Sequence, residues 1–148
     1  MAKSTSKSAI TINIRGYDDA VRRLGIVRSA YEKDVTNIMT VWAEDTAQQL
    51  RNKRYPPELA NQKYVRTGLL GRSWKGKRVK MTTVVISNNA NSGRSQFYAR
   101  YVVGDDRGVN QAQIHKGRWW IARETILVNH VPELVEKLDN LYLTRWAE

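Results

Sequence analysis

Polar and apolar residues alternate strictly over residues 10–14, where three isoleucines share one face and a threonine and an asparagine share the other. This period of two is typical of a half-buried β-strand. Gly16 breaks the pattern, and Asp18 or Asp19 can cap a helix that follows, because its carboxylate accepts the free N–H groups of a first turn. Gly25 ends or loosens that helix. The start of the chain therefore predicts a strand followed by a short helix.

Apolar residues then recur at steps of three and four over residues 29–53, which is the period of one face of an α-helix. These positions are Tyr31, Val35, Ile38, Met39, Trp42, Ala43, Ala47 and Leu50. Pro56 and Pro57 stop the helix by Tyr55, because the residue before a proline is pushed out of the helical region. The pattern predicts a long amphipathic helix. A loop follows over residues 55–66, and loops of that length often have a function.

β-Branched residues dominate the segment 79–87, which predicts a second strand. Residues 88–93 are rich in Asn, Ser and Gly, which favour turns. Phe97–Val103 is a candidate for a third strand that closes a hairpin with the second. A short helix over Tyr98–Val102 is the competing interpretation.

A helical pattern returns near the C-terminus, after a turn over residues 104–108 and a polar stretch over residues 109–118. One side of it carries Val131, Leu134, Val135, Leu138, Leu141, Tyr142, Arg145 and Trp146. Pro132 fits a first-turn position, where no N–H is needed, and Glu133 suits the positive end of the helix dipole. We therefore expect a C-terminal helix that begins near Val131.

The order of these elements predicts the α+β class, with an antiparallel β-sheet packed against a long N-terminal helix and a C-terminal helix. The chain has 148 residues, the length of one domain. Residues 1–9 read as a flexible N-terminal tail and residues 10–148 as a single α+β domain. No apolar run approaches the length needed to cross a bilayer, and the start lacks the apolar core of a secretory signal. We expect the protein to stay in a cytoplasm-like compartment.

The chain has no cysteine, which excludes disulfides, thiolate metal sites and thiol catalysis. Its two histidines, His115 and His130, are expected to be solvated surface residues. A metal cluster of His115 with Asp105, Asp106 or Glu124 matches no ligand spacing that fixes a geometry. No glycine-rich phosphate loop or dinucleotide motif occurs. The sequence therefore predicts no enzyme, no metal and no cofactor.

The formal charge of +11 is concentrated in residues 51–80. That segment holds ten Lys or Arg and one acidic residue, a net of +9, whereas the rest holds 15 basic and 13 acidic residues, a net of +2. The ten cations are Arg51, Lys53, Arg54, Lys63, Arg66, Arg72, Lys75, Lys77, Arg78 and Lys80. Such an excess attracts an acidic protein surface or a polyanion. The alternative is a solvated face that serves solubility.

Aromatic residues interleave with these cations at Tyr55, Tyr64 and Trp74. Aromatic rings that stack on bases, beside cations that contact phosphates, are typical of proteins that bind single-stranded nucleic acid. The segment matches no recognised DNA- or RNA-binding motif. A small basic nucleic-acid-binding protein is therefore the alternative function.

The stretch Arg66–Trp74 reads R-T-G-L-L-G-R-S-W. It resembles the R-T-G-x-L-x-x-S signature of the neck, head–tail joining and tail-completion proteins of long-tailed phages and prophages. The expected elements also follow the order of that family: a strand, two helices, a proline-containing loop, the Thr-Gly motif, a hairpin, a Tyr-Ala segment and a C-terminal helix. Gln113–Trp120 resembles a variant found in phage members, whereas Tyr101–Gly104 lacks the acidic residue of the Val-Glu-x-Gly stretch that many members carry.

The resemblance implies a minor structural protein of the virion, assembled in the cytoplasm of the host bacterium. Such proteins form a ring with copies of themselves and contact neighbouring connector or tail proteins, with non-specific DNA contact possible and no membrane. We expect Thr67 and Gly68 to make a tight turn, after which Leu69 and Leu70 place an apolar side chain on a sheet face and Ser73 and Trp74 begin a strand. Basic and aromatic residues would form the partner interface: Arg51, Lys53, Arg54, Tyr55, Lys63, Tyr64, Arg66, Arg72, Trp74, Trp119 and Trp120. Trp146 is a further candidate anchor, and core burial is the alternative for each tryptophan.

Overall fold

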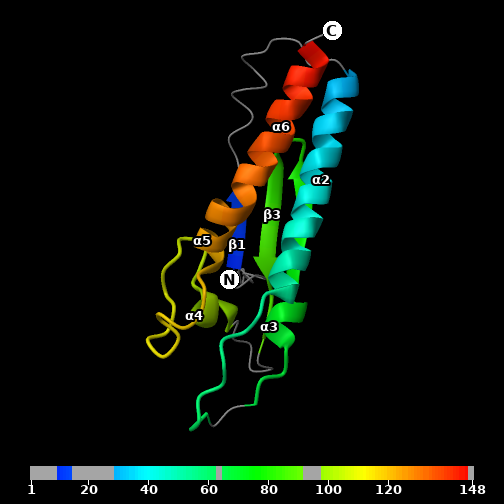
Figure 1. The fold of residues 1–148 in the computed structure, drawn as a ribbon. Helices are drawn as coiled ribbons and strands as arrows, with labels where there is room; N and C mark the ends of the chain where they lie inside the picture. The colour runs from blue at the N-terminus through cyan, green and yellow to red at the C-terminus, as the bar shows by residue number, and fades with distance from the viewer. Residues whose placement is uncertain (1–9, 15–28, 63–64, 92–97, 147–148) are drawn as a thin grey trace.

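The computed structural model describes residues 10–14, 29–62, 65–91 and 98–146 of the chain (Figure 1). The tail predicted over residues 1–9 and the short helix predicted after Gly16 lie outside the described residues.

The sheet has three antiparallel strands, β1 (Ile10–Ile14), β2 (Trp74–Lys80) and β3 (Thr83–Asn88), in the order β1-β3-β2. The predicted strand over residues 10–14 is confirmed as β1, and its Ile12 is buried opposite Ile86 of β3. β3 lies between the other two strands (Figure 1), and its Val84 and Ile86 are fully buried in the core.

The prediction of one strand over residues 79–87 is wrong, because the chain turns back on itself at Met81 and Thr82. The hairpin is therefore formed by β2 and β3, and β2 begins at Trp74 as the Thr-Gly motif predicted. The β-branched run of β3 was visible in the sequence. The pattern of apolar and polar residues did not reveal the lysine-rich edge strand β2 that pairs with β3.

The predicted third strand over Phe97–Val103 is also wrong, and the competing interpretation of a short helix is confirmed. Helix α4 (Ala99–Val103) buries Ala99 and Val103, which are four residues apart and share one helical face. Tyr98 precedes the helix, and its backbone N–H donates to the carbonyl of Ala90 at 3.2 Å. This bond ties α4 to the segment that follows β3.

The long helix is confirmed as α2 (Ser29–Asn52), which lies across β2 and β3 (Figure 1). Its buried face is the predicted one, with Val35, Met39, Trp42, Ala43, Ala47 and Leu50 in the core. The helix approaches the sheet most closely at Gly76. A Cβ atom at that position would lie 1.7 Å from the backbone oxygen of Ala43, so only glycine allows this contact.

A single helical turn, α3 (Leu69–Arg72), joins the loop to β2. Gly68 precedes it with φ of 70°, which confirms the tight turn expected at Thr67 and Gly68. Leu70 is buried in the core from this helical turn and not from a strand. Its carbonyl accepts a hydrogen bond from the buried amide of Asn88 at 2.7 Å, which fixes the turn to the end of β3.

The C-terminal helix begins about nine residues earlier than predicted. It comprises α5 (Ala122–Thr125), a π-helical segment η1 (Ile126–His130) and α6 (Val131–Trp146). The N–H of Val131 donates to the carbonyl of Ile126, five residues back. Since Pro132 has no N–H, this wider turn accommodates the place where an α-helical bond is missing. The π-turn also interrupts the apolar period, which hid the first part of the helix from the sequence pattern.

Helices α2 and α6 lie side by side on one face of the sheet, whereas α3 and α4 lie near its end (Figure 1). The buried indole N–H of Trp42 donates to the carbonyl of His130 at 2.9 Å and links the two helices. The predicted α+β class, with an antiparallel sheet packed against a long helix and a C-terminal helix, is confirmed. In the described part of the chain, no helix is both long enough and apolar enough to span a membrane.

Candidate interaction surface

The loop that follows α2 is anchored by Tyr55. Its ring packs against Trp119 with the ring centres 5.0 Å apart. Its hydroxyl accepts a hydrogen bond from the backbone N–H of Gly71 at 2.7 Å. The loop predicted over residues 55–66 is therefore fastened at its first turn to α3 and to the segment before α5.

Arg66 closes the other end of the same loop. Its guanidinium carbon lies 5.9 Å from the centre of the Tyr55 ring and 5.4 Å from that of Trp119. It donates to the carbonyls of Pro56 and Pro57 and lies 3.8 Å from the Glu58 carboxylate. The side chain is only 14% exposed. Arg66 therefore holds the loop together from inside, although we expected it to face a partner.

A cavity of about 530 Å³ opens between this loop, α3 and α4. Its lining is mainly aromatic and aliphatic, and includes Tyr55, Leu69, Leu70, Tyr98, Tyr101, Val102, His115 and Trp119. Burial lowers the pKa of His115, and the nearby cations Arg118 and Arg66 lower it further. The cavity therefore combines apolar walls with an imidazole that favours its neutral form.

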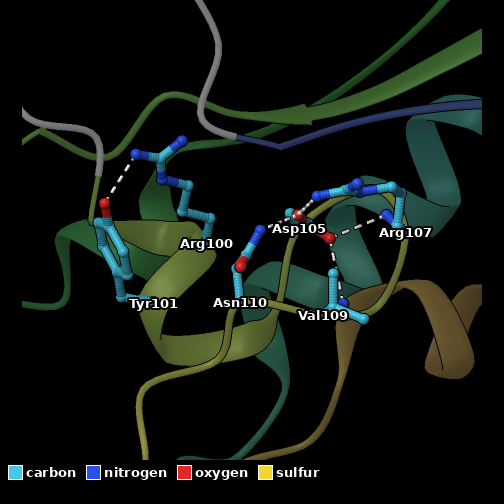
Figure 2. Close-up of polar contacts among 6 residues, drawn as sticks. All are labelled: Arg100, Tyr101, Asp105, Arg107, Val109 and Asn110. Carbon is cyan, nitrogen blue, oxygen red and sulfur yellow. Dashed lines mark hydrogen bonds and ion pairs between the residues drawn. The ribbon is translucent and has the colours of Figure 1, made fainter.

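The turn after α4 is organised by Asp105 (Figure 2). Its carboxylate accepts the backbone N–H groups of Arg107 at 3.0 Å and Val109 at 3.1 Å, and the side-chain amide of Asn110 at 2.6 Å. Although burial opposes ionisation, these hydrogen bonds lower the pKa of Asp105 overall. The predicted turn over residues 104–108 is confirmed, and a buried carboxylate holds it.

Gln111 connects this turn to the wall of the cavity. Its side-chain amide donates to the carbonyl of Val102 in α4 at 2.8 Å and to that of Trp119 at 3.3 Å. Arg118, next in the chain to Trp119, donates to the Pro57 carbonyl at 2.8 Å. The segment that carries Trp119 is thus tied both to α4 and to the loop.

A second cluster of cations and aromatic rings lies at the end of α2. The ring of Trp74 is 5.9 Å from that of Trp120, and the Lys53 ammonium lies 5.4 Å from the Trp120 ring. Arg51 donates two hydrogen bonds to the Trp74 carbonyl, at 2.9 and 2.7 Å. Trp74 itself is 0% exposed, so its indole is not available to a partner in this conformation.

The predicted interface residues therefore fall into distinct groups. Tyr55, Arg66 and Trp119 form one cluster inside the molecule. Arg51, Lys53, Trp74 and Trp120 form another, in which Trp74 is buried and Arg51 is exposed. The two remaining described cations, Arg54 and Arg72, are exposed, and Arg72 also donates to the carbonyl of Thr67. Lys63 and Tyr64 lie outside the described residues, as does the side chain of Trp146. Which of these residues contact a partner stays a prediction.

Three further exposed cations of the basic segment lie on β2. Lys75, Lys77 and Lys80 are exposed and make no hydrogen bond or ion pair with the described residues. They were counted in the basic segment but not among the interface residues. Strand alternation from Trp74 identifies Lys75 and Lys77, because every second residue from Lys75 then points away from α2, whereas Lys80 follows a shift of register after Arg78.

The two histidines differ in their surroundings. The expectation that both are solvated is wrong for His130, which is 6% exposed where η1 meets α6. Burial lowers its pKa, the nearby Glu133 raises it in part, and Lys53 lowers it. Among the residues that the structure describes, no three His, Asp or Glu side chains gather into a potential metal site.

Three comparisons with known proteins gave no match to this chain: a scan of protein-family models, a search of curated proteins and a search of solved structures. The resemblance of Arg66–Trp74 to phage neck proteins therefore remains a prediction from the sequence.

Proposed function

We propose that this chain is a structural subunit of a tailed-phage virion. It is a head–tail connector (neck) or tail-completion protein that assembles into a ring joining head and tail through protein–protein contacts. The R-T-G-L-L-G-R-S stretch over residues 66–73 carries the proposal. The order of strand, long helix, proline-containing loop, hairpin and C-terminal helix agrees with that family.

The surroundings of this stretch support an architectural role for it. Gly68 provides the left-handed turn, Leu70 enters the core, and Arg66 clamps the loop before it. Each of these residues sets the path of the backbone between α2 and the hairpin. A stretch of this kind specifies a shape, and a shape is what a subunit of a ring must present to its neighbours.

The alternative, a small nucleic-acid-binding protein, has one specific observation in its favour. Lys75, Lys77 and Lys80 form an exposed positive row on β2. The prediction that aromatic rings of this segment stack on bases loses support, because Trp74 is buried and the Tyr55 ring packs against Trp119. The alternative predicts tight binding to duplex or single-stranded DNA by a monomer. A virion subunit predicts no binding, or weak, sequence-independent binding that is lost steeply as salt rises.

The proposal is tested in the phage or prophage that encodes the chain, by deleting its reading frame and supplying the protein from a plasmid. We expect the deletion to leave unjoined heads and tails in electron micrographs, and the plasmid to restore joined particles. Mass spectrometry of purified particles should detect the chain. Normal yields of infectious particles without it would refute the proposal.

A further inference from the structure

The outward side of the C-terminal helix is partly apolar. Val128 is 71% exposed, Val135 is 40% exposed and Leu143 is 61% exposed. In α6, Pro132, Val135, Asp139 and Leu143 follow one another at steps of three, four and four, so they share one face, and Val128 lies about one turn before Pro132 in η1. We call these five residues, together with Glu136 at the edge of the same face, the α6 stripe.

The α6 stripe is acidic as well as apolar. Glu136 and Asp139 are exposed, and the stripe contains no cation. The nearby Lys137 is bound to Glu133 at 2.8 Å, outside the stripe. Leu134 and Leu138, on the opposite side of the helix, are buried in the core. The stripe therefore faces away from the sheet.

A surface of matching character lies on the sheet. Lys75, Lys77, Val79 and Lys80 of β2 are all exposed, and we call them the β2 outer face. Because Gly76 contacts the backbone of α2, its neighbours in the strand point to the other side of the sheet. The β2 outer face is therefore basic and partly apolar, and it is turned away from the helices.

We propose that the α6 stripe of one copy of this chain binds the β2 outer face of the next copy. In the described part of the chain α2 and α6 lie on one face of the sheet (Figure 1), so the α6 stripe and the β2 outer face are turned in opposite directions. A contact between two different patches is heterologous, and it builds a ring when the rotation between copies closes. This inference rests on the proposed function and names the surfaces through which the subunits join.

The charge and the apolar character of the two surfaces together indicate that each binds a second copy of the chain. Glu136 and Asp139 offer carboxylates to the ammonium groups of Lys75 and Lys77, and the exposed valines and leucine on the two surfaces are buried by the same contact. A nucleic acid would engage only the lysines and would leave the α6 stripe uncovered. Each copy carries both surfaces, so one chain is sufficient to build the assembly.

Charge reversal on each surface tests the pairing. Glu136→Lys with Asp139→Lys makes both surfaces basic, whereas Lys75→Glu with Lys77→Glu makes both acidic. We expect each double variant to lose at least about tenfold in association constant, measured by sedimentation velocity at low salt. An equimolar mixture of the two should regain association, because each then offers the surface that the other lacks. The variant with all four changes should associate with itself but not with the wild type.

Matched controls separate this contact from a general effect of net charge. Glu44→Lys with Asp45→Lys and Lys33→Glu with Lys116→Glu make the same changes in charge at exposed positions outside the two surfaces. These variants should associate like the wild type, and circular dichroism should show the same fold for all. A wild type that stays monomeric, or a mixture that fails to regain association, would overturn the inference. Such a result leaves the deletion experiment unaffected, whereas normal particles without the chain would refute the virion role even if the copies associate as expected.

Discussion

The guanidinium of Arg66 lies 5.4 Å from the centre of the Trp119 ring, and this contact joins the loop after α2 to the segment before α5. Tyr55 packs on the same indole with ring centres 5.0 Å apart, so one tryptophan receives both ends of the loop. A cation in such a position stabilises the fold through its attraction to the aromatic rings and its hydrogen bonds to backbone carbonyls. The positive charge of Arg66 in this loop therefore stabilises contacts inside the molecule.

Removing the Arg66 side chain should destabilise the fold. Arg66→Ala deletes the contacts with Tyr55 and Trp119 and the hydrogen bonds to the carbonyls of Pro56 and Pro57, of which Pro57 keeps the one from Arg118. We expect a loss of about 1–2 kcal/mol in the free energy of unfolding, measured by urea denaturation. Arg54→Ala removes the same charge from an exposed position and should leave stability unchanged. Equal stability of the two variants would show that Arg66 is not a clamp.

The carboxylate of Asp105 is expected to be necessary for the turn after α4. Asp105→Ala leaves the N–H groups of Arg107 and Val109 and the amide of Asn110 without their common acceptor. Because these donors lie around a buried group, we expect a loss of about 2–3 kcal/mol in thermal or urea unfolding. The neighbouring Asp106→Ala alters an exposed carboxylate and serves as the control. A similar small effect of both changes would contradict the role assigned to Asp105.

Hydrophobic periodicity predicted β1 and α2 because the apolar residues of each element recur at the period of its secondary structure. It failed for β2, whose outer face carries lysines and whose inner face has Gly76 where α2 comes close. Neither residue type signals a strand. It failed again at the start of the C-terminal helix, because a π-turn over Ile126–His130 changes the residue spacing before the regular period of α6 begins.

The candidate surface was predictable only in part. Composition indicated that residues 51–80 are basic, but whether a cation faces solvent depends on contacts between distant segments. Arg66 meets Trp119 and Arg51 meets the carbonyl of Trp74 only after the chain has folded. The exposure of Lys75 and Lys77 follows from the sequence once the first residue of the strand is known, because strand alternation then assigns their face, but the shift of register before Lys80 does not follow from it.

Gly76 is the position at which a small substitution should cost most. Gly76→Ala places a Cβ atom 1.7 Å from the backbone oxygen of Ala43, so helix and strand must separate. We expect a loss of about 3 kcal/mol or more, or failure to fold, as judged by circular dichroism and urea unfolding. Gly117→Ala is the comparison: it meets no neighbouring atom, and its positive φ should cost only about 1 kcal/mol. A mild effect at Gly76 would mean that α2 can move away from β2 without loss of core packing.

Stability should fall as the pH drops below neutrality, because the folded protein holds its histidines in their neutral form. Burial lowers the pKa of both His130 and His115 below the ordinary value of 6.5. The unfolded chain therefore binds protons first as the pH falls through about 6.5, and unfolding becomes easier until the folded-state pKa values are passed. Above that window neither histidine makes the stability depend on pH.

Urea unfolding of the wild type at about pH 7.5 and about pH 5.5 measures the loss in free energy of unfolding on acidification. The same two measurements on the double variant His115→Gln, His130→Gln show how much of that loss the two imidazoles cause. The comparison uses the difference between the two pH values, because replacing the buried His130 changes stability at every pH. Glu133 raises the pKa of His130 and Lys53 lowers it. Lys53→Gln should therefore raise the His130 pKa and reduce the loss of stability on acidification. If the double variant loses as much stability as the wild type between the two pH values, the titrating groups are not the histidines.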